Sequence, residues 1–178
     1  MLLLAAGTAH GELTPASRFT VEELERAPEM TPKQFGNLFE NFRYDFSPYV
    51  LPVDEFLDDR RGDCDDYAIL ADHVLSPKGY RTRLIRVVIT GSDVAHVICY
   101  VTEKKAYLDY NNRKYFVNLE RSGPSLRQIA TKVADSFEKN WTSATEFTFS
   151  YATYRKTARF TVVKTDPPAQ DPDRRAAR

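Results

Sequence analysis

Arg60-Arg61-Gly62-Asp63-Cys64-Asp65-Asp66-Tyr67-Ala68 places a cysteine where a turn meets the start of a predicted helix. Asp63 is a good N-cap, and Asp66, three residues further on, completes the pattern of a capping box. The unpaired N–H groups and the macrodipole at a helix N-terminus favour negative charge, and therefore a thiolate. We interpret Cys64 as a candidate nucleophile. Cys99, in contrast, alternates with valines on a predicted strand, which is typical of a buried structural cysteine.

A histidine and an aspartate follow on two predicted strands. His96 lies on a strand over residues 94–102, and Asp109 ends a strand over residues 105–109. A turn near residues 101–104 would place the two directly opposite each other, with Cβ atoms about 5 Å apart; the next even register would leave them diagonal, at roughly 7 Å, and still within reach. A carboxylate in that position can orient an imidazole. Taken singly, His96 could be a structural histidine and Asp109 the start of a turn.

The remaining pattern predicts helices, then a meander of strands and a further helix, which is the α+β class. The expected elements are a short helix over 21–26, a helix after the N-cap Thr31, an ordered loop over 44–57, the helix from Cys64 to a stop at 77–79, strands over 81–90, 94–102, 105–109 and 113–117, a helix over 126–139, and an antiparallel pair over 146–151 and 159–163. We expect a single domain over 31–165, preceded by an irregular lead-in over 1–30 and followed by a disordered tail over 166–178.

Composition excludes several classes of protein. The 178 residues carry 25 basic and 25 acidic side chains, so no excess of positive charge indicates binding to nucleic acid or to an anionic membrane. Two cysteines are too few for a disulfide scaffold, and no segment reaches transmembrane length. Residues 1–9 resemble the second half of a signal peptide, which favours a periplasmic or secreted protein over the cytoplasmic alternative. We expect a monomer.

Three short motifs together resemble the transglutaminase-like superfamily, and most closely its bacterial transglutaminase-like cysteine proteinases. They are Gly62-Asp63-Cys64-Asp65-Asp66-Tyr67-Ala68-Ile69, Ala95-His96-Val97 and Leu108-Asp109. The resemblance implies a papain-like fold, in which the helix that carries the cysteine packs on an antiparallel sheet that carries the other two residues. It also implies roles: Cys64 as nucleophile, His96 as general base and acid, and Asp109 as the orienting carboxylate. Tyr49 stands where the family often has a tryptophan.

The activity implied by the resemblance is hydrolysis of a peptide or amide bond in a protein or peptide substrate, through a thioester intermediate. The sequence leaves two alternatives open. An amine acceptor would make the protein a transglutaminase or peptide-crosslinking enzyme, and loss of chemistry would leave a binding module on the same fold. The second oxyanion donor is also open among Tyr44, Tyr49 and a backbone group.

A cluster of aspartates surrounds the candidate nucleophile: Asp58, Asp59, Asp63, Asp65 and Asp66. Uncompensated carboxylates would oppose ionisation of a thiol, and a bound Ca²⁺ would remove that penalty. Some proteinases of the resembled branch use calcium, with acidic residues flanking the cysteine where Asp63 and Asp65 stand here. Helix capping and the neighbouring Arg60 and Arg61 explain the same cluster without a metal ion. Calcium at Asp63 and Asp65 is therefore a hypothesis that stands beside a structural explanation.

Overall fold

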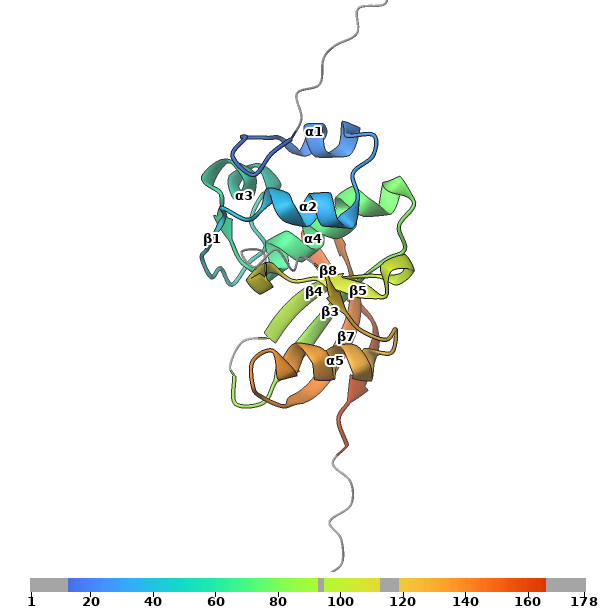
Figure 1. Cartoon of the computed structure of the whole chain (residues 1–178). Helices are drawn as coiled ribbons and strands as arrows, with labels where there is room; N and C mark the ends of the chain where they lie inside the picture. The colour runs from blue at the N-terminus through green and yellow to red at the C-terminus, as the bar shows by residue number, and fades with distance from the viewer. Residues whose placement is uncertain (1–12, 93–94, 113–118, 166–178) are drawn as a thin grey trace, which may run out of the picture.

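The computed structural model describes residues 13–92, 95–112 and 119–165. A six-stranded antiparallel sheet forms its centre, with the N-terminal helices packed on one face and helix α5 (Leu126–Asp135) on the other (Figure 1). Helix α4 (Cys64–Leu75) belongs to the larger of the two hydrophobic cores and lies against the sheet. The α+β class and the packing of the cysteine-bearing helix on an antiparallel sheet are therefore confirmed.

The sheet has the strand order β6-β5-β4-β3-β7-β8. Its strands are β3 (Thr82–Ile89), β4 (Ala95–Val101), β5 (Ala106–Leu108), β6 (Glu120–Arg121), β7 (Trp141–Ser150) and β8 (Arg155–Val163). Strand β4 is buried on both faces, because Val97 and Cys99 enter the core under the helices while Ile98 and Tyr100 enter the core under α5. The middle of this sheet is thus packed on both faces, and this packing limits the movement of the side chains that β4 carries, His96 among them.

The helical half consists of α1 (Val21–Arg26), α2 (Pro32–Leu38), α3 (Val53–Asp59) and α4, together with a two-stranded parallel ribbon of β1 (Arg43–Tyr44) and β2 (Arg61–Gly62). Thr20 and Thr31 cap α1 and α2 through capping boxes. A cluster of buried rings fills the space between these helices: Phe35, Phe39, Phe42, Phe56 and Tyr67. This aromatic core fixes α4 relative to the segments that precede it.

Several predicted boundaries were wrong. The loop expected as far as Leu57 gives way to helix α3, whose start follows Pro52 and which buries Phe56 and Leu57. Helix α5 ends at Asp135 rather than near Lys139, because Glu138 adopts a left-handed conformation with φ 54°. Strands β7 and β8 begin earlier than expected.

The first half of β7 was not predicted, because its buried residues do not alternate as in a regular strand. Trp141, Ala144 and Phe147 are buried at spacings of three, and register shifts after Val88 and after Glu146 break the simple alternation of a strand. The strand expected over 113–117 and the expected tail over 166–178 lie outside the described residues. The other predicted helices and strands are present close to their expected bounds.

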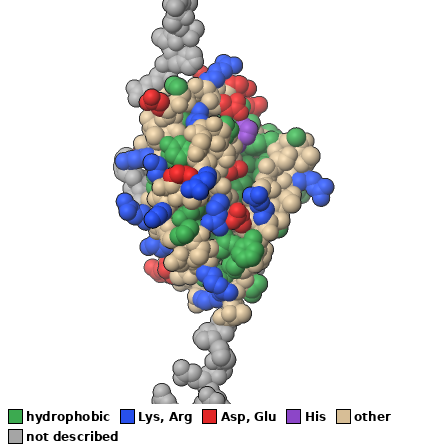
Figure 2. Space-filling view, turned by 90° about the vertical axis from the view of Figure 1, so that its right-hand side faces the viewer, with side chains coloured by type: hydrophobic (Ala, Val, Ile, Leu, Met, Phe, Trp, Pro, Cys, Tyr) green, Lys and Arg blue, Asp and Glu red, His purple; other side chains and the backbone are tan. Residues whose placement is uncertain are grey.

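The face shown in Figure 2 carries basic side chains spread over its surface, with acidic side chains and small hydrophobic areas between them. Within the described residues, none of the helices combines the length and apolar character that a bilayer span requires. Both cysteines are free thiols.

Candidate active site

The N-terminus of α4 presents Cys64 as its first residue, with 8% of the residue exposed. Asp63 caps the helix: its Oδ1 accepts a hydrogen bond from the Asp65 backbone N–H at 2.8 Å, and its own N–H donates to Asp66 Oδ2 at 2.9 Å. The predicted capping box is therefore confirmed, reciprocal bond included. The Cys64 N–H lies among the helix N-terminal groups that have no intrahelical acceptor, where they can stabilise an anion.

The two carboxylates of this capping box also hold the preceding loop. Asp63 Oδ2 accepts a hydrogen bond from Ser47 N–H at 3.2 Å, and Asp66 Oδ1 accepts one from Leu51 N–H at 2.8 Å. Both aspartates are buried, and burial raises the pKa of each carboxyl, that of Asp66 to about 6. The loop over residues 45–52 is thereby fixed to the start of helix α4.

Gly62 allows this close packing. A Cβ at position 62 would lie 2.6 Å from Asp66 Oδ2 and 2.6 Å from the ring of Phe56. Real side chains do not approach so closely, so any larger residue would displace the capping carboxylate or the ring. The glycine of the Gly-Asp-Cys string is thus explained by space rather than by backbone conformation.

His96 and Asp109 meet as the sequence predicted, through a different register. Strand β4 pairs Cys99 with Leu108, so Asp109 falls level with Ile98 and lies diagonal to His96, not directly opposite it. His96 Nε2 is nevertheless 2.9 Å from Asp109 Oδ1, and both side chains are buried. The same carboxylate oxygen accepts a hydrogen bond from Asn111 N–H at 2.9 Å, which fixes its orientation.

The electrostatics of His96 favour its protonated form. Burial alone would lower the pKa of the imidazole, but the charge and hydrogen bond of Asp109, followed by a hydrogen-bonding interaction and charge from Cys64, raise it to about 10. Because Nε2 is used by Asp109, Nδ1 is the ring nitrogen left for the thiol. The ring edge packs against Phe137, with centroids 5.0 Å apart. The arrangement thus favours an imidazolium beside Cys64.

Of the two tyrosines considered as oxyanion donors, Tyr44 is the one whose hydroxyl is affected by the charge of Cys64. Strand β1 pairs Tyr44 with Gly62, two residues before Cys64. Burial raises the pKa of the Tyr44 hydroxyl, and the charges of Cys64, Asp63 and Asp65 raise it further. Tyr49, in contrast, is 79% exposed. Tyr44 and the backbone N–H groups of α4 therefore remain as donors for an oxyanion.

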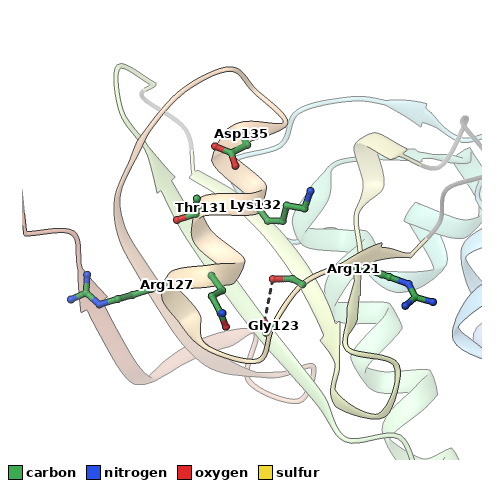
Figure 3. A pocket seen from close by; sticks show the side chains of 8 residues that line it. Arg121, Gly123, Arg127, Thr131, Lys132 and Asp135 are labelled. Atoms are coloured by element: carbon green, nitrogen blue, oxygen red, sulfur yellow. Dashed lines mark hydrogen bonds between the residues drawn. The ribbon is translucent and has the colours of Figure 1, made fainter.

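A groove lies along α5, lined by basic and polar residues of that helix and of the turn that precedes it (Figure 3). Arg121, Arg127, Lys132 and Asp135 are among its labelled side chains, whereas Cys64, His96 and Asp109 are not part of it. The groove belongs to the opposite face of the sheet from α4.

A family model described as a transglutaminase-like domain matches residues 22–121, which is more than half of the chain and includes Cys64, His96 and Asp109. The chain belongs to the transglutaminase-like family. No curated protein matches the sequence. Two solved structures of Legionella pneumophila LapG are similar in outline. The calcium-bound one is 17% identical, covers 70% of this chain and 68% of its own, and has a TM-score of 0.45. The EGTA-treated one is 16% identical, covers 78% and 76%, and has a TM-score of 0.44.

In this transglutaminase-like domain, the two aspartates that were predicted to bind calcium have other partners. Both oxygens of Asp63 accept backbone hydrogen bonds, and Asp65 Oδ2 is in contact with the ammonium of Lys156. Asp65 Oδ1 is the one buried carboxylate oxygen of the pair with no hydrogen-bond partner. Among the described residues, no group of three or more His, Cys, Asp or Glu side chains could hold a metal ion.

Sequence analysis missed three contributors to this site. Ser47 and Leu51 donate hydrogen bonds through their backbone N–H groups. Any residue except proline could supply such a group, so the side chains give no indication of these bonds. Lys156 lies 91 residues from its partner Asp65 and comes from the tip of the β7–β8 hairpin. One signal was available, because five aspartates with only two arginines among them leave a net negative charge that a cation from a distant part of the chain can balance.

Proposed function

We propose that this transglutaminase-like protein is a thiol hydrolase that cleaves a peptide or amide bond with Cys64, His96 and Asp109 as its catalytic triad. The observation that carries the proposal is the buried 2.9 Å bond between His96 Nε2 and Asp109 Oδ1, in a histidine whose pKa is also raised by Cys64. Cys64, the second partner of that imidazole, begins a capped helix. A module that only binds would not need all three features together.

The proposed reaction has two steps, acylation of Cys64 and hydrolysis of the resulting thioester, and His96 transfers one proton in each. The Cys64 thiolate attacks the carbonyl carbon, and the oxyanion that forms is stabilised by the N–H groups at the start of α4 and by Tyr44. The His96 imidazolium gives its proton to the departing nitrogen, which leaves as an amine while a thioester remains. Water then attacks the thioester while the neutral imidazole takes a proton from it, and the adduct expels the Cys64 thiolate, so that the acid is released and the thiolate and imidazolium are restored. Asp109 keeps the imidazole oriented and stabilises its charge.

An activated ester tests this proposal without knowledge of the natural substrate. The p-nitrophenyl ester of N-acetylphenylalanine should release a burst of p-nitrophenolate equal to the enzyme concentration, with the acyl group found on Cys64 by mass spectrometry. Cys64→Ala should give no burst, whereas Cys99→Ala should give a full one, because Cys99 is buried and burial raises the pKa of its thiol. A burst that survives in Cys64→Ala would refute the assignment of the nucleophile.

The same acyl-enzyme distinguishes water from an amine as the acceptor. When methylamine is added after the burst, a hydrolase should release mainly N-acetylphenylalanine. A transglutaminase or crosslinking enzyme should release mainly its methylamide. The proposed thiol and imidazole would serve both outcomes equally, so the ratio of the two products assigns the reaction class.

Calcium binding at Asp63 and Asp65 remains a hypothesis based on the sequence, and it can be tested separately. If Ca²⁺ supports the site, thorough EGTA treatment should slow acylation of Cys64, and added Ca²⁺ should restore it. An acylation rate that is the same in EGTA and in Ca²⁺ would remove calcium from the account of this protein.

A further inference from the structure

The positive charge nearest to the aspartates beside Cys64 comes from the far end of the chain. Lys156 is the second residue of β8, and its ammonium contacts Asp65 Oδ2, one residue after Cys64. The Asp65 side chain is partly buried, with 21% of it exposed, whereas Lys156 is exposed to 37%. An ion pair that is partly withdrawn from water is screened less than one on the surface.

The hairpin that carries Lys156 lies along α4. Its turn places the ring of Tyr151 5.1 Å from the ring of His73, in the last turn of α4, while Lys156 reaches Asp65 in the first turn. Lys156 Nζ also lies 6.0 Å from the ring of Phe147, which belongs to the core under α4. The orange-to-red hairpin accordingly rises to the level of α4 in Figure 1. The position of the Lys156 ammonium is therefore fixed by several contacts between the hairpin and α4.

The charges at the start of α4 need such a partner. Asp63, Asp65 and Asp66 are three carboxylates within four residues, and each raises the cost of a further negative charge on Cys64. Arg61, the nearest arginine in the sequence, is engaged elsewhere, because it pairs with Asp45 and Asp59. Lys156 contacts Asp65 directly, and its charge also acts on Asp63.

We propose that Lys156 is a positioning residue that supplies, from within the chain, the positive charge that balances the carboxylates around the nucleophile, in the place where the sequence had suggested a metal ion. This inference rests on the proposed function, since it takes Cys64 as the nucleophile. The contact with Asp65, the two engaged oxygens of Asp63 and the placement of the hairpin on α4 carry it.

The test compares alkylation of Cys64 by iodoacetamide, at one neutral pH and low salt, among charge variants. Lys156→Met should slow labelling about twofold to fivefold, Lys156→Arg should keep the wild-type rate, and the double variant Asp65→Asn with Lys156→Met should recover most of it. Added NaCl should shrink the difference between wild type and Lys156→Met. Lys164→Met is the matched control, because Lys164 follows β8 at its other end and pairs with Asn140.

Three results would overturn the proposal. The first is a rate in Lys156→Met equal to that of wild type. The second is equal slowing in Lys156→Arg, or no recovery in the double variant, since a lysine that acts only by packing would behave so. The third is a wild-type rate that falls in EGTA and returns with Ca²⁺, because the cation would then be the metal ion.

A second measurement separates this inference from the proposed function. Urea unfolding of wild type, the two single variants Asp65→Asn and Lys156→Met, and the double variant gives the coupling of the pair without any thiol chemistry. Zero coupling overturns the Lys156 proposal even if Cys64 is reactive. Measurable coupling together with a Cys64 that labels no faster than Cys99 supports the ion pair and rejects the triad.

Discussion

At the scale of single residues, the account depends on how Asp109 acts on His96. The carboxylate is buried, bonded to Nε2, and oriented by the Asn111 N–H. Its charge is what overcomes the effect of burial, which on its own would lower the pKa of the imidazole. The protonated ring in turn is the proton donor that the proposed mechanism needs.

Asp109→Asn should therefore lower the pKa of His96 by about 1 to 3, because it removes the nearest opposite charge from a buried ring. NMR titration of the imidazole nitrogens would measure it, with wild-type His96 still protonated well above pH 7. The His73 signal is an internal control, since His73 lies on the last turn of α4 and pairs with Glu25. A His96 titration that is identical in wild type and variant would show that Asp109 does not set the charge of the ring.

At the scale of elements, the start of α4 is both a helix cap and an anchor for the loop over residues 45–52. Asp63 and Asp66 serve the helix through one oxygen each and the loop through the other. An ordinary capping residue has only the first of these tasks, as at α2, where Thr31 caps an exposed turn.

Asp63→Ala should consequently cost more free energy of unfolding than Thr31→Ala. We expect about 2–4 kcal/mol for Asp63, which loses a cap and leaves the Ser47 N–H without its acceptor, against about 1 kcal/mol for Thr31. Urea unfolding gives both values, and hydrogen exchange should show the Ser47 amide losing protection in Asp63→Ala alone. Equal costs with an unchanged Ser47 amide would mean that Asp63 only caps the helix.

Gly62→Ala should destabilise the protein by about 1–3 kcal/mol, because its Cβ would overlap Asp66 Oδ2 and Phe56. The matched control is Gly79→Asn: Gly79 has φ +89°, nothing lies within 4 Å of a Cβ built there, and asparagine tolerates such a helix-end conformation. Thermal unfolding would compare the two. A tolerated Gly62→Ala would show that the capping carboxylate or the ring moves aside at little cost.

At the scale of the whole molecule, the site is assembled where the two halves of the fold meet. Cys64 comes from the helical half, His96 and Asp109 from the sheet, and Lys156 from the hairpin that closes the chain. Stability and site chemistry are therefore linked through the same titrating groups.

Stability should depend on pH through His96. A histidine whose pKa is higher in the folded state stabilises the fold fully below its unfolded pKa of about 6.5, and that contribution is lost as the pH rises to about 10. We expect the difference in free energy of unfolding between wild type and His96→Gln to shrink over this interval. Urea unfolding at several pH values measures it. A difference that stays constant, or grows with pH, would contradict the raised pKa.

Features that depend on residues close together in the sequence were predicted more accurately than features that depend on distant residues. The Cys64 helix, its N-cap and its capping box depend on residues within four positions, and the sequence predicted them. The pairing of His96 with Asp109 was predicted from strand parity, although the turn at Thr102–Lys104, with Lys105 at φ 48°, leaves Asp109 two residues along β4 from the predicted position. The parity survived because the shift was even.

Other features depend on contacts that no local pattern encodes. The bulges of β7 hid its first half, and Lys156 finds Asp65 only once the hairpin has folded over α4. Boundaries such as the end of α5 depend on one left-handed residue, Glu138, which is not a glycine and so gave no signal. The sequence thus predicted which residues come together at the candidate site better than it predicted the charges that surround them.

The central claim is that His96 activates Cys64, and the rate of alkylation by iodoacetamide tests it most directly. Labelling of Cys64 and Cys99 would be followed by mass spectrometry between pH 5 and 9 in wild type and in His96→Ala. The account predicts fast labelling of Cys64 well below pH 8.5 in wild type, lost in His96→Ala, with Cys99 slow in both. Slow and equal labelling of the two cysteines, unaffected by His96→Ala, would contradict it and leave a binding module on a transglutaminase-like fold.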